Sequence, residues 1–194
     1  MRCRAHKIME KLSDTNKQYD EAVGACRKIY ISKTKDYGTS WRVLRTISIA
    51  DQLFIKARRI RTLQETELTK VGEDKAGEFK AMVNYGIIGL IQGSIGPEAA
   101  EELSVEEAGN RYDEQGAVAR EVMLAKNHDY GEAWRDMSQE SFVDLILMKI
   151  LRIRQILAND GKTLISEGID SNFIDIINYS VFALILIGEG KHSA

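Results

Sequence analysis

The sequence is poor in proline, cysteine and histidine, and it carries almost no net charge. Pro97 is the single proline among 194 residues, so little in the chain interrupts a helix. The two cysteines, Cys3 and Cys26, have neither metal-ligand spacing nor a disulfide pattern, which favours a reducing compartment. With 27 basic and 29 acidic residues the formal net charge is −2, so no overall field directs the chain to nucleic acid or an anionic membrane.

Long apolar runs are also missing. The longest, Val181–Ile187, falls far short of the roughly 20 residues that cross a bilayer. No apolar secretory segment follows the start of the chain. The three histidines form no triad, and the sequence contains neither a Walker loop nor a dinucleotide fingerprint. We therefore expect a cytoplasmic protein with no membrane segment and no strong nucleic-acid signal.

The residues that are abundant favour helices. Long stretches combine Ala, Leu, Ile, Glu, Lys and Arg, with apolar positions at helical spacing and glycines where helices should end. A hydrophobic content of 44% is enough to form a core. The sequence therefore predicts an all-α protein.

The chain repeats itself. KDYGTSWR at residues 35–42 returns as HDYGEAWR at residues 128–135, and this offset of 93 gives 16 identities in the 43 positions from Tyr19 to Arg61. After one inserted residue the match resumes, with Asn84 and Tyr85 opposite Asn178 and Tyr179. A tandem duplication is the economical explanation.

Each copy should form three helices. Their expected bounds are 15–35, 47–65 and 74–92 in the first unit and 104–127, 138–159 and 169–187 in the second, with a Gly-Pro linker between the units. We place the units at 1–95 and 96–194 and expect them to pack as a pseudo-twofold helical bundle, together forming one compact domain. The sequence leaves open whether the chain also forms a homo-oligomer.

An Asp-Tyr-Gly-x-x-Trp motif follows the first helix of each unit. Its aromatic residues are Tyr37, Trp41, Tyr130 and Trp134. They either anchor the packing of the helices or line a pocket in which an aromatic ring stacks on a base.

The second helix of each unit carries Asp-x₄-Lys-x₂-Arg-x-Arg. The polar residues are Asp51, Lys56, Arg59 and Arg61 in the first unit and Asp144, Lys149, Arg152 and Arg154 in the second. Lysine and arginine beside an apolar surface are suited to phosphate binding, whereas an internal salt-bridge network is the alternative. If they bind a ligand, Asp51, Asp144 and these cations should converge on one cleft.

The third helix of the second unit aligns Glu167, Asp175 and Asn178 on one stripe of an otherwise apolar helix. Two such carboxylates are costly to bury without a cation, and Mg²⁺ prefers carboxylate oxygens. The first unit keeps Glu73, but Ala81 stands opposite Asp175. We therefore expect a metal site with Glu73, Glu167 and Asp175 as candidate ligands, and stronger metal binding by the second unit.

DYGxxW, DxxxxKxxR and Glu-x₇-Asp-x-x-Asn-Tyr together resemble the nucleotide modification associated domain of the first type, once in each unit. The helical form and the acidic helix are also similar to MazG-like and dimeric dUTPase-like pyrophosphohydrolases, in which helix-borne acids hold Mg²⁺ beside a nucleotide. The two E-x-x-E/D pairs of the MazG pattern are absent from this sequence.

These features give three functional hypotheses. The first is Mg²⁺-dependent hydrolysis of a nucleoside triphosphate, or of a modified nucleotide, to the monophosphate and pyrophosphate. The second is a non-catalytic module that binds nucleotides, and the third is a helical scaffold. In the first hypothesis, Asp144, Glu167 and Asp175 are the catalytic acids, and Lys56, Arg59, Lys149 and Arg152 bind the phosphates.

Overall fold

The computed structural model describes residues 2–66, 74–96, 102–163, 165 and 167–194, with side chains from residue 14 onward. The described residues form helices and turns without a strand, which confirms the all-α prediction. The elements are α1 (Arg2–Tyr37), η1 (Ser40–Val43), α2 (Thr46–Thr66) and α3 (Lys75–Ile95), then α4 (Val105–Tyr130), η2 (Ala133–Asp136), α5 (Gln139–Ala158) and α6 (Ile169–Gly188). The order helix, short 3₁₀ turn, helix, helix therefore occurs twice.

Local sequence signals account for most of the helix ends. Asp74, Ser104 and Ser138 cap α3, α4 and α5, and each side chain accepts a hydrogen bond from a backbone N–H of the first turn. Gly38 and Gly131 follow α1 and α4 with φ of 63° and 64°, a conformation that glycine adopts without strain. The start of α1 differs from the prediction, because the helix begins at Arg2 rather than near residue 15. The sequence has no Pro or Gly between residues 2 and 23 that would interrupt a helix there.

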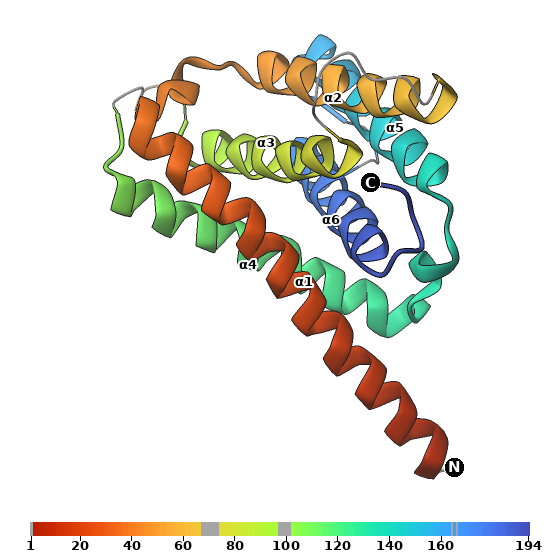
Figure 1. Cartoon of the computed structure of the whole chain (residues 1–194). Coiled ribbons are helices and arrows are strands. Elements are labelled where there is room, and N and C mark those ends of the chain that lie inside the picture. Colours follow the sequence, from red (N-terminus) through yellow and green to blue (C-terminus); the bar gives the residue numbers. More distant parts are fainter. Residues whose placement is uncertain (1, 67–73, 97–101, 164, 166) are drawn as a thin grey trace.

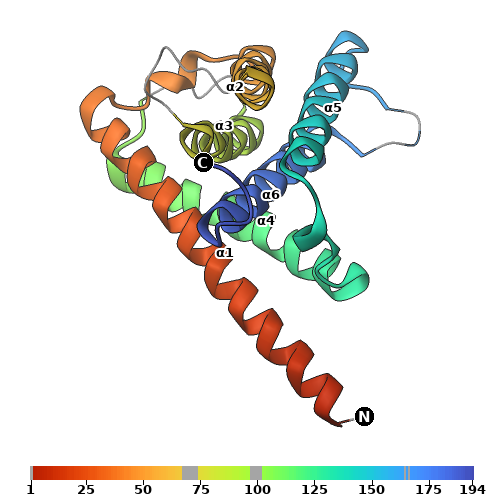
Figure 2. The ribbon, with the colours of Figure 1, turned by 45° about the vertical axis from the view of Figure 1, so that its right-hand side comes forward.

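The six helices form three layers, each built from one helix of each unit. α1 lies with α4, α3 with α6, and α2 with α5 (Figures 1 and 2). The α3–α6 layer is central and contacts both of the others. The N-terminal part of α1 projects beyond the bundle in both views.

Both units contribute to one hydrophobic core, in which α6 is the most apolar helix. By length and composition α6 is the one described helix that could cross a membrane. Its most apolar window, however, is 72% buried inside the bundle. Such burial is what the core helix of a packed bundle requires.

Buried hydrogen bonds tie the units together in reciprocal pairs. The Tyr19 hydroxyl on α1 donates to Asn178 Oδ1 on α6 at 2.7 Å, and the Tyr112 hydroxyl on α4 donates to Asn84 Oδ1 on α3 at 2.8 Å. Each asparagine Nδ2 in turn donates to a backbone carbonyl of its own unit, at 3.1 Å. Because every contact recurs with the units exchanged, the pairing has the twofold character expected from the repeat.

Ion pairs at the surface repeat the same symmetry. Arg27 binds Asp113 and Arg120 binds Asp20 across α1 and α4, at 2.6 and 2.7 Å. Across α2 and α5, Arg61 binds Asp144 at 2.9 Å and Arg154 binds Asp51 at 2.7 Å. These pairs are largely exposed, so they set the register of the units more than the stability.

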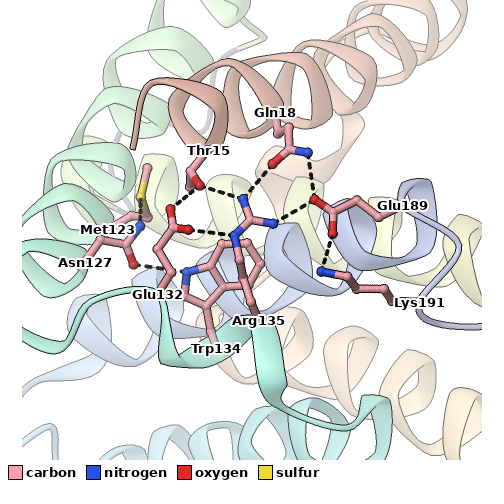
Figure 3. Close-up of polar contacts among 9 residues, drawn as sticks. All are labelled: Thr15, Gln18, Met123, Asn127, Glu132, Trp134, Arg135, Glu189 and Lys191. Atoms are coloured by element: carbon pink, nitrogen blue, oxygen red, sulfur yellow. Dashed lines mark hydrogen bonds and ion pairs between the residues drawn. The ribbon is translucent and has the colours of Figure 1, made fainter. Parts of the chain in front are cut away.

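The arginine after each tryptophan breaks the symmetry. Figure 3 shows Arg135 at the centre of a polar cluster that joins η2, α1 and the end of α6. Its guanidinium binds Glu132 at 2.8 Å and Glu189 at 2.7 Å. It also donates to Thr15 at 2.6 Å and to Gln18 at 2.7 Å. The charge of Arg135 is thus fully compensated.

Arg42, the counterpart in the first unit, is buried without a carboxylate among the described residues. Thr39 and Ile95 stand where the second unit has its two glutamates. One Nη of Arg42 donates to Gln92, while Nε and the other Nη have no hydrogen-bond partner. Burial and, to a smaller extent, the charge of Arg111 lower the pKa of Arg42. Burial of the Arg42 guanidinium therefore lowers the stability of the fold.

Replacing the two arginines by methionine should have opposite consequences. Arg135→Met strands two carboxylates in a partly buried site and should lower the free energy of unfolding by about 3 kcal/mol. Arg42→Met removes an uncompensated charge and should change it by less than about 1 kcal/mol. Urea unfolding of the matched pair measures the difference, and equal losses would contradict this account.

The Arg135 cluster should also make the fold sensitive to acid. Burial opposes ionisation of Glu189, but hydrogen bonds from Lys191, Gln18 and Arg135 lower its pKa from 4.5 to about 2. A depressed carboxyl pKa stabilises the fold fully above the unfolded value, and that stabilisation disappears as the pH falls from about 4.5 to about 2. Glu189→Gln should therefore be less stable than the parent chain at pH 7, with the difference vanishing near pH 2 in thermal unfolding. A constant difference across this range would exclude the ionised carboxylate as its cause.

Candidate functional site

A cavity of about 430 Å³ opens in the first unit between the end of α1, η1, α2 and α3. Its cationic lining residues are Lys33, Lys56 and Lys80, and its aromatic ones are Tyr30, Tyr37, Trp41 and Tyr85. Glu78 is the one acidic residue among the described lining residues. Three lysines and one glutamate give the cavity wall a formal charge of +2. The cavity is thus suited to an anion that also carries a flat apolar group.

The Asp-Tyr-Gly-x-x-Trp motif builds the mouth of this cavity. Gly38 ends α1 in the left-handed region, and its backbone N–H donates to the Thr34 carbonyl at 2.9 Å. The chain then turns through η1, which places Trp41 against Tyr30 with 6.3 Å between ring centroids. Tyr37 stays at the rim, 71% exposed. Trp41 therefore packs against Tyr30 and also lines the cavity.

Charged residues from α2 and α3 form the inner wall. Lys56 Nζ lies 3.0 Å from Glu78 Oε2, and Arg59 donates to the other oxygen of Glu78. Glu78 is 1% exposed, so both cations help to offset the cost of burying its charge. Lys33 and Lys80 have no ion-pair partner among the described residues. These two ammonium groups supply the uncompensated charge of the cavity.

The corresponding place in the second unit is filled. Asp175 Oδ1 lies 2.6 Å from Lys126 Nζ, and Asp175 Oδ2 lies 2.5 Å from Lys149 Nζ. Partial burial opposes the charge of Lys126, but the hydrogen bond and the charge of Asp175 together raise its pKa. Phe182 stacks on Trp134 at 4.2 Å with an interplanar angle of 5°. A carboxylate and a ring thus occupy what is open space in the first unit.

Two substitutions between the repeats explain this difference. Lys126 and Lys149 correspond to Lys33 and Lys56, which line the open cavity. Asp175 and Phe182, however, are replaced in the first unit by Ala81 and Ile88, which are also lining residues. The smaller side chains leave both lysines in place and remove the carboxylate between them, so Lys33 has no ion-pair partner among the described residues while Lys56 pairs with Glu78.

The structure divides the predicted site residues among several places. Lys56, Tyr37 and Trp41 line the cavity of the first unit, and Arg59 adjoins it through Glu78. In the second unit, Lys149 binds Asp175, Trp134 is buried, and Tyr130 is 76% exposed. Asp144, Arg152 and Glu167 line a separate, more open groove of about 1160 Å³ along α5. Glu73 lies outside the described residues.

The single cleft predicted for the two Asp-Lys-Arg motifs is therefore not what the described residues form. Asp51 and Asp144 face the partner unit's arginines across α2 and α5, as the salt-bridge alternative expected. Lys149 instead turns toward α6 and Lys56 toward α3. The aspartate and the lysine of each motif, five residues apart on one helix, therefore contact two different neighbouring helices.

The described acids do not favour the predicted Mg²⁺ site. No group of three or more His, Cys, Asp or Glu side chains within the described ranges could hold a metal ion. Both oxygens of Asp175 accept from lysines, and ammonium groups at that distance repel a divalent cation. Glu167 is exposed at the separate groove. Of the acids that we expected to bind a metal, Asp175 binds two lysines instead.

Three residues of the site were not singled out from the sequence. Glu78 lies opposite Asn172 in the repeat, so a search for shared residues passes over it. Lys33 and Lys126 match each other, but they precede the motif by three residues and carry no pattern of their own. Helical spacing offered a signal, since Glu78 lies four residues after the Asp74 cap, on the face of α3 that meets α2.

Removing the charge of Asp175 should destabilise the second unit. Asp175→Asn leaves Lys149, which is 8% exposed, without a counter-charge, so the free energy of unfolding should fall by about 3 kcal/mol. Asp129→Asn is the matched control, because Asp129 is exposed and bonds only to its neighbour His128; its effect should stay below about 0.5 kcal/mol. Urea unfolding compares them, and a harmless Asp175→Asn would show that the pair is not essential to the fold.

Comparison with known families gives one match in each unit. The family model of nucleotide modification associated domain 1 matches residues 33–92 and 126–187. The two segments begin at Lys33 and Lys126 and include the whole of η1 and α2, or of η2 and α5. No curated protein and no solved structure matches the chain.

Proposed function

Because this chain belongs to the nucleotide modification associated domain 1 family, we propose that its first unit is a nucleotide-binding module. The cavity of that unit would receive the ligand, with the phosphates at the lysines and the base at the aromatic rim. The second unit would serve as the structural partner that completes the bundle. This proposal follows the second of the three hypotheses.

The observation that carries the proposal is the internal anion of the second unit. Asp175 lies between two lysines there, and in the first unit the matching lysines line the cavity beside Ala81. Lys33 has no ion-pair partner among the described residues, and Lys56 also pairs with Glu78. A phosphate oxygen pair can accept from two ammonium groups as a carboxylate does. The repeat thus marks the position at which an anionic group would sit in the first unit.

The aromatic residues of the cavity suit a base. Tyr37, Trp41 and Tyr85 come from α1, η1 and α3 and surround the same space. Stacking on such rings contributes about 1–3 kcal/mol per base and tolerates every base. A volume of about 430 Å³ falls within the usual range of small-ligand pockets.

The acids favour binding over the predicted Mg²⁺-dependent hydrolysis. Hydrolysis on a metal needs carboxylates that are available to hold the ion beside the phosphates. Glu78, the one described acid at the cavity, is already bound by Lys56 and Arg59. A module that binds phosphate with lysines needs no Mg²⁺. The dependence of binding on Mg²⁺ therefore distinguishes the two hypotheses.

Nucleoside mono-, di- and triphosphates should bind equally well with Mg²⁺ and with chelator in isothermal titration. Lys33→Ala should weaken binding by about 10- to 100-fold, because an ammonium hydrogen bond to phosphate contributes about 1.5–3 kcal/mol. Lys28→Ala is the matched control, since Lys28 is exposed on the same helix and does not line the cavity. The Lys28→Ala variant should bind nucleotide with the same affinity as the parent chain.

Two results would contradict the proposal. If no nucleotide binds, or if Lys28→Ala and Lys33→Ala weaken binding alike, the cavity is not the site. If pyrophosphate is released from a triphosphate only when Mg²⁺ is present, the protein is a hydrolase rather than a binding module. A pyrophosphate-release assay on the same samples distinguishes these results.

A further inference from the structure

We propose that the second unit contains a latent phosphate-binding site, which Asp175 of the chain itself occupies. The protein would accordingly take one ligand per chain although it carries two copies of the site. The inference concerns a different site from the nucleotide cavity, and it rests on the proposed function only for the class of anion.

The geometry around Asp175 is that of a bound oxyanion. Each carboxylate oxygen receives one lysine, at 2.6 Å from Lys126 and 2.5 Å from Lys149. The lysines come from α4 and α5 and the carboxylate from α6, so three helices converge on one anion. Asp175 is 5% exposed, which makes it a built-in part of the core rather than a surface ion pair.

The first unit has the same lysine positions with a different arrangement of charge. There Lys33 and Lys56 line the open cavity, and Ala81 on α3 stands where the second unit has Asp175. Lys56 pairs with Glu78, whereas Lys33 has no ion-pair partner among the described residues. The lysine positions therefore exist with the carboxylate of Asp175 and without it.

The latent site should accept a phosphate group but not a whole nucleotide. Phe182 stacks on Trp134 and fills the part that would receive a base. The phosphate end stays near solvent, since the Lys126 side chain is 48% exposed. The charge of Glu167 acts on Lys126 at this end of the site, and the charge of Arg152 acts on Tyr179. Inorganic phosphate is thus the suitable probe.

Four chains test the inference: the parent, Ala81→Asp, Asp175→Ala and the double variant that exchanges the two residues. Each is titrated with inorganic phosphate and, as the control, with sodium chloride at equal ionic strength. Phosphorus NMR counts bound phosphate, and thermal unfolding measures stabilisation. At about ten times the dissociation constant, one phosphate should raise Tm by about 3–6 °C.

The expected numbers of phosphate sites are one in the parent, none in Ala81→Asp, two in Asp175→Ala and one in the exchanged chain. In the exchanged chain the site should have moved, so Lys126→Ala should abolish binding there and leave the parent unchanged. Glu121→Ala, which removes an exposed carboxylate from α4, should gain no site. If Asp175→Ala fails to fold, Asp175→Ser, which removes the charge and also shortens the side chain, replaces it.

The outcomes separate this inference from the proposed function. If Asp175→Ala and Asp175→Ser bind no more phosphate than the parent, the latent site does not exist, whatever the first unit binds. If the parent binds neither nucleotide nor phosphate but Asp175→Ala gains one phosphate that depends on Lys126, the latent site stands and the nucleotide cavity is wrong.

Discussion

Two buried tyrosine–asparagine hydrogen bonds hold the arrangement on which everything else depends. Each joins an outer helix of one unit to the central helix of the other, so neither unit alone can satisfy the amide oxygen of its asparagine. A buried amide without a partner costs about 1–3 kcal/mol, which penalises any other register of the units. Because the register is fixed, the lysines of α1 and α4 meet the central helices at set positions. The cavity of the first unit and the filled site of the second are consequences of that single alignment.

On this symmetric frame the chemistry is asymmetric. At two places the second unit has a carboxylate among cations where the first has a small or apolar residue: Asp175 stands opposite Ala81, and Glu189 opposite Ile95. Lys149 and Arg135 thus bind carboxylates of their own unit, while the first unit keeps Lys33, Lys80 and Arg42 without acids of their own among the described residues. Excess positive charge in one half favours an anionic ligand there, although the net charge of the chain is slightly negative.

The helices could be predicted from the sequence because their signals are local. Periodic apolar positions, the caps at Asp74, Ser104 and Ser138, and the glycines after the tyrosines predicted every helix bound except the start of α1 to within a few residues. The repeat predicted that the two units pack with pseudo-twofold symmetry. The site was harder to predict, because the sequence position of a carboxylate does not show whether it will bind a metal or a lysine of another helix. Ala81 was interpreted as a lost ligand. In the folded chain its small size is what leaves the cavity open.

The reciprocal hydrogen bonds have an evolutionary consequence. Each unit carries both members of the pair, a tyrosine and an asparagine, so a single unit has a self-complementary surface and could have existed as a homodimer. In a homodimer one gene encodes both sites, and every substitution changes both at once. Fusion of two copies released that constraint. The difference between Ala81 and Asp175 is a change that a homodimer encoded by one gene cannot make, and it allowed one half to specialise in stability while the other kept an opening.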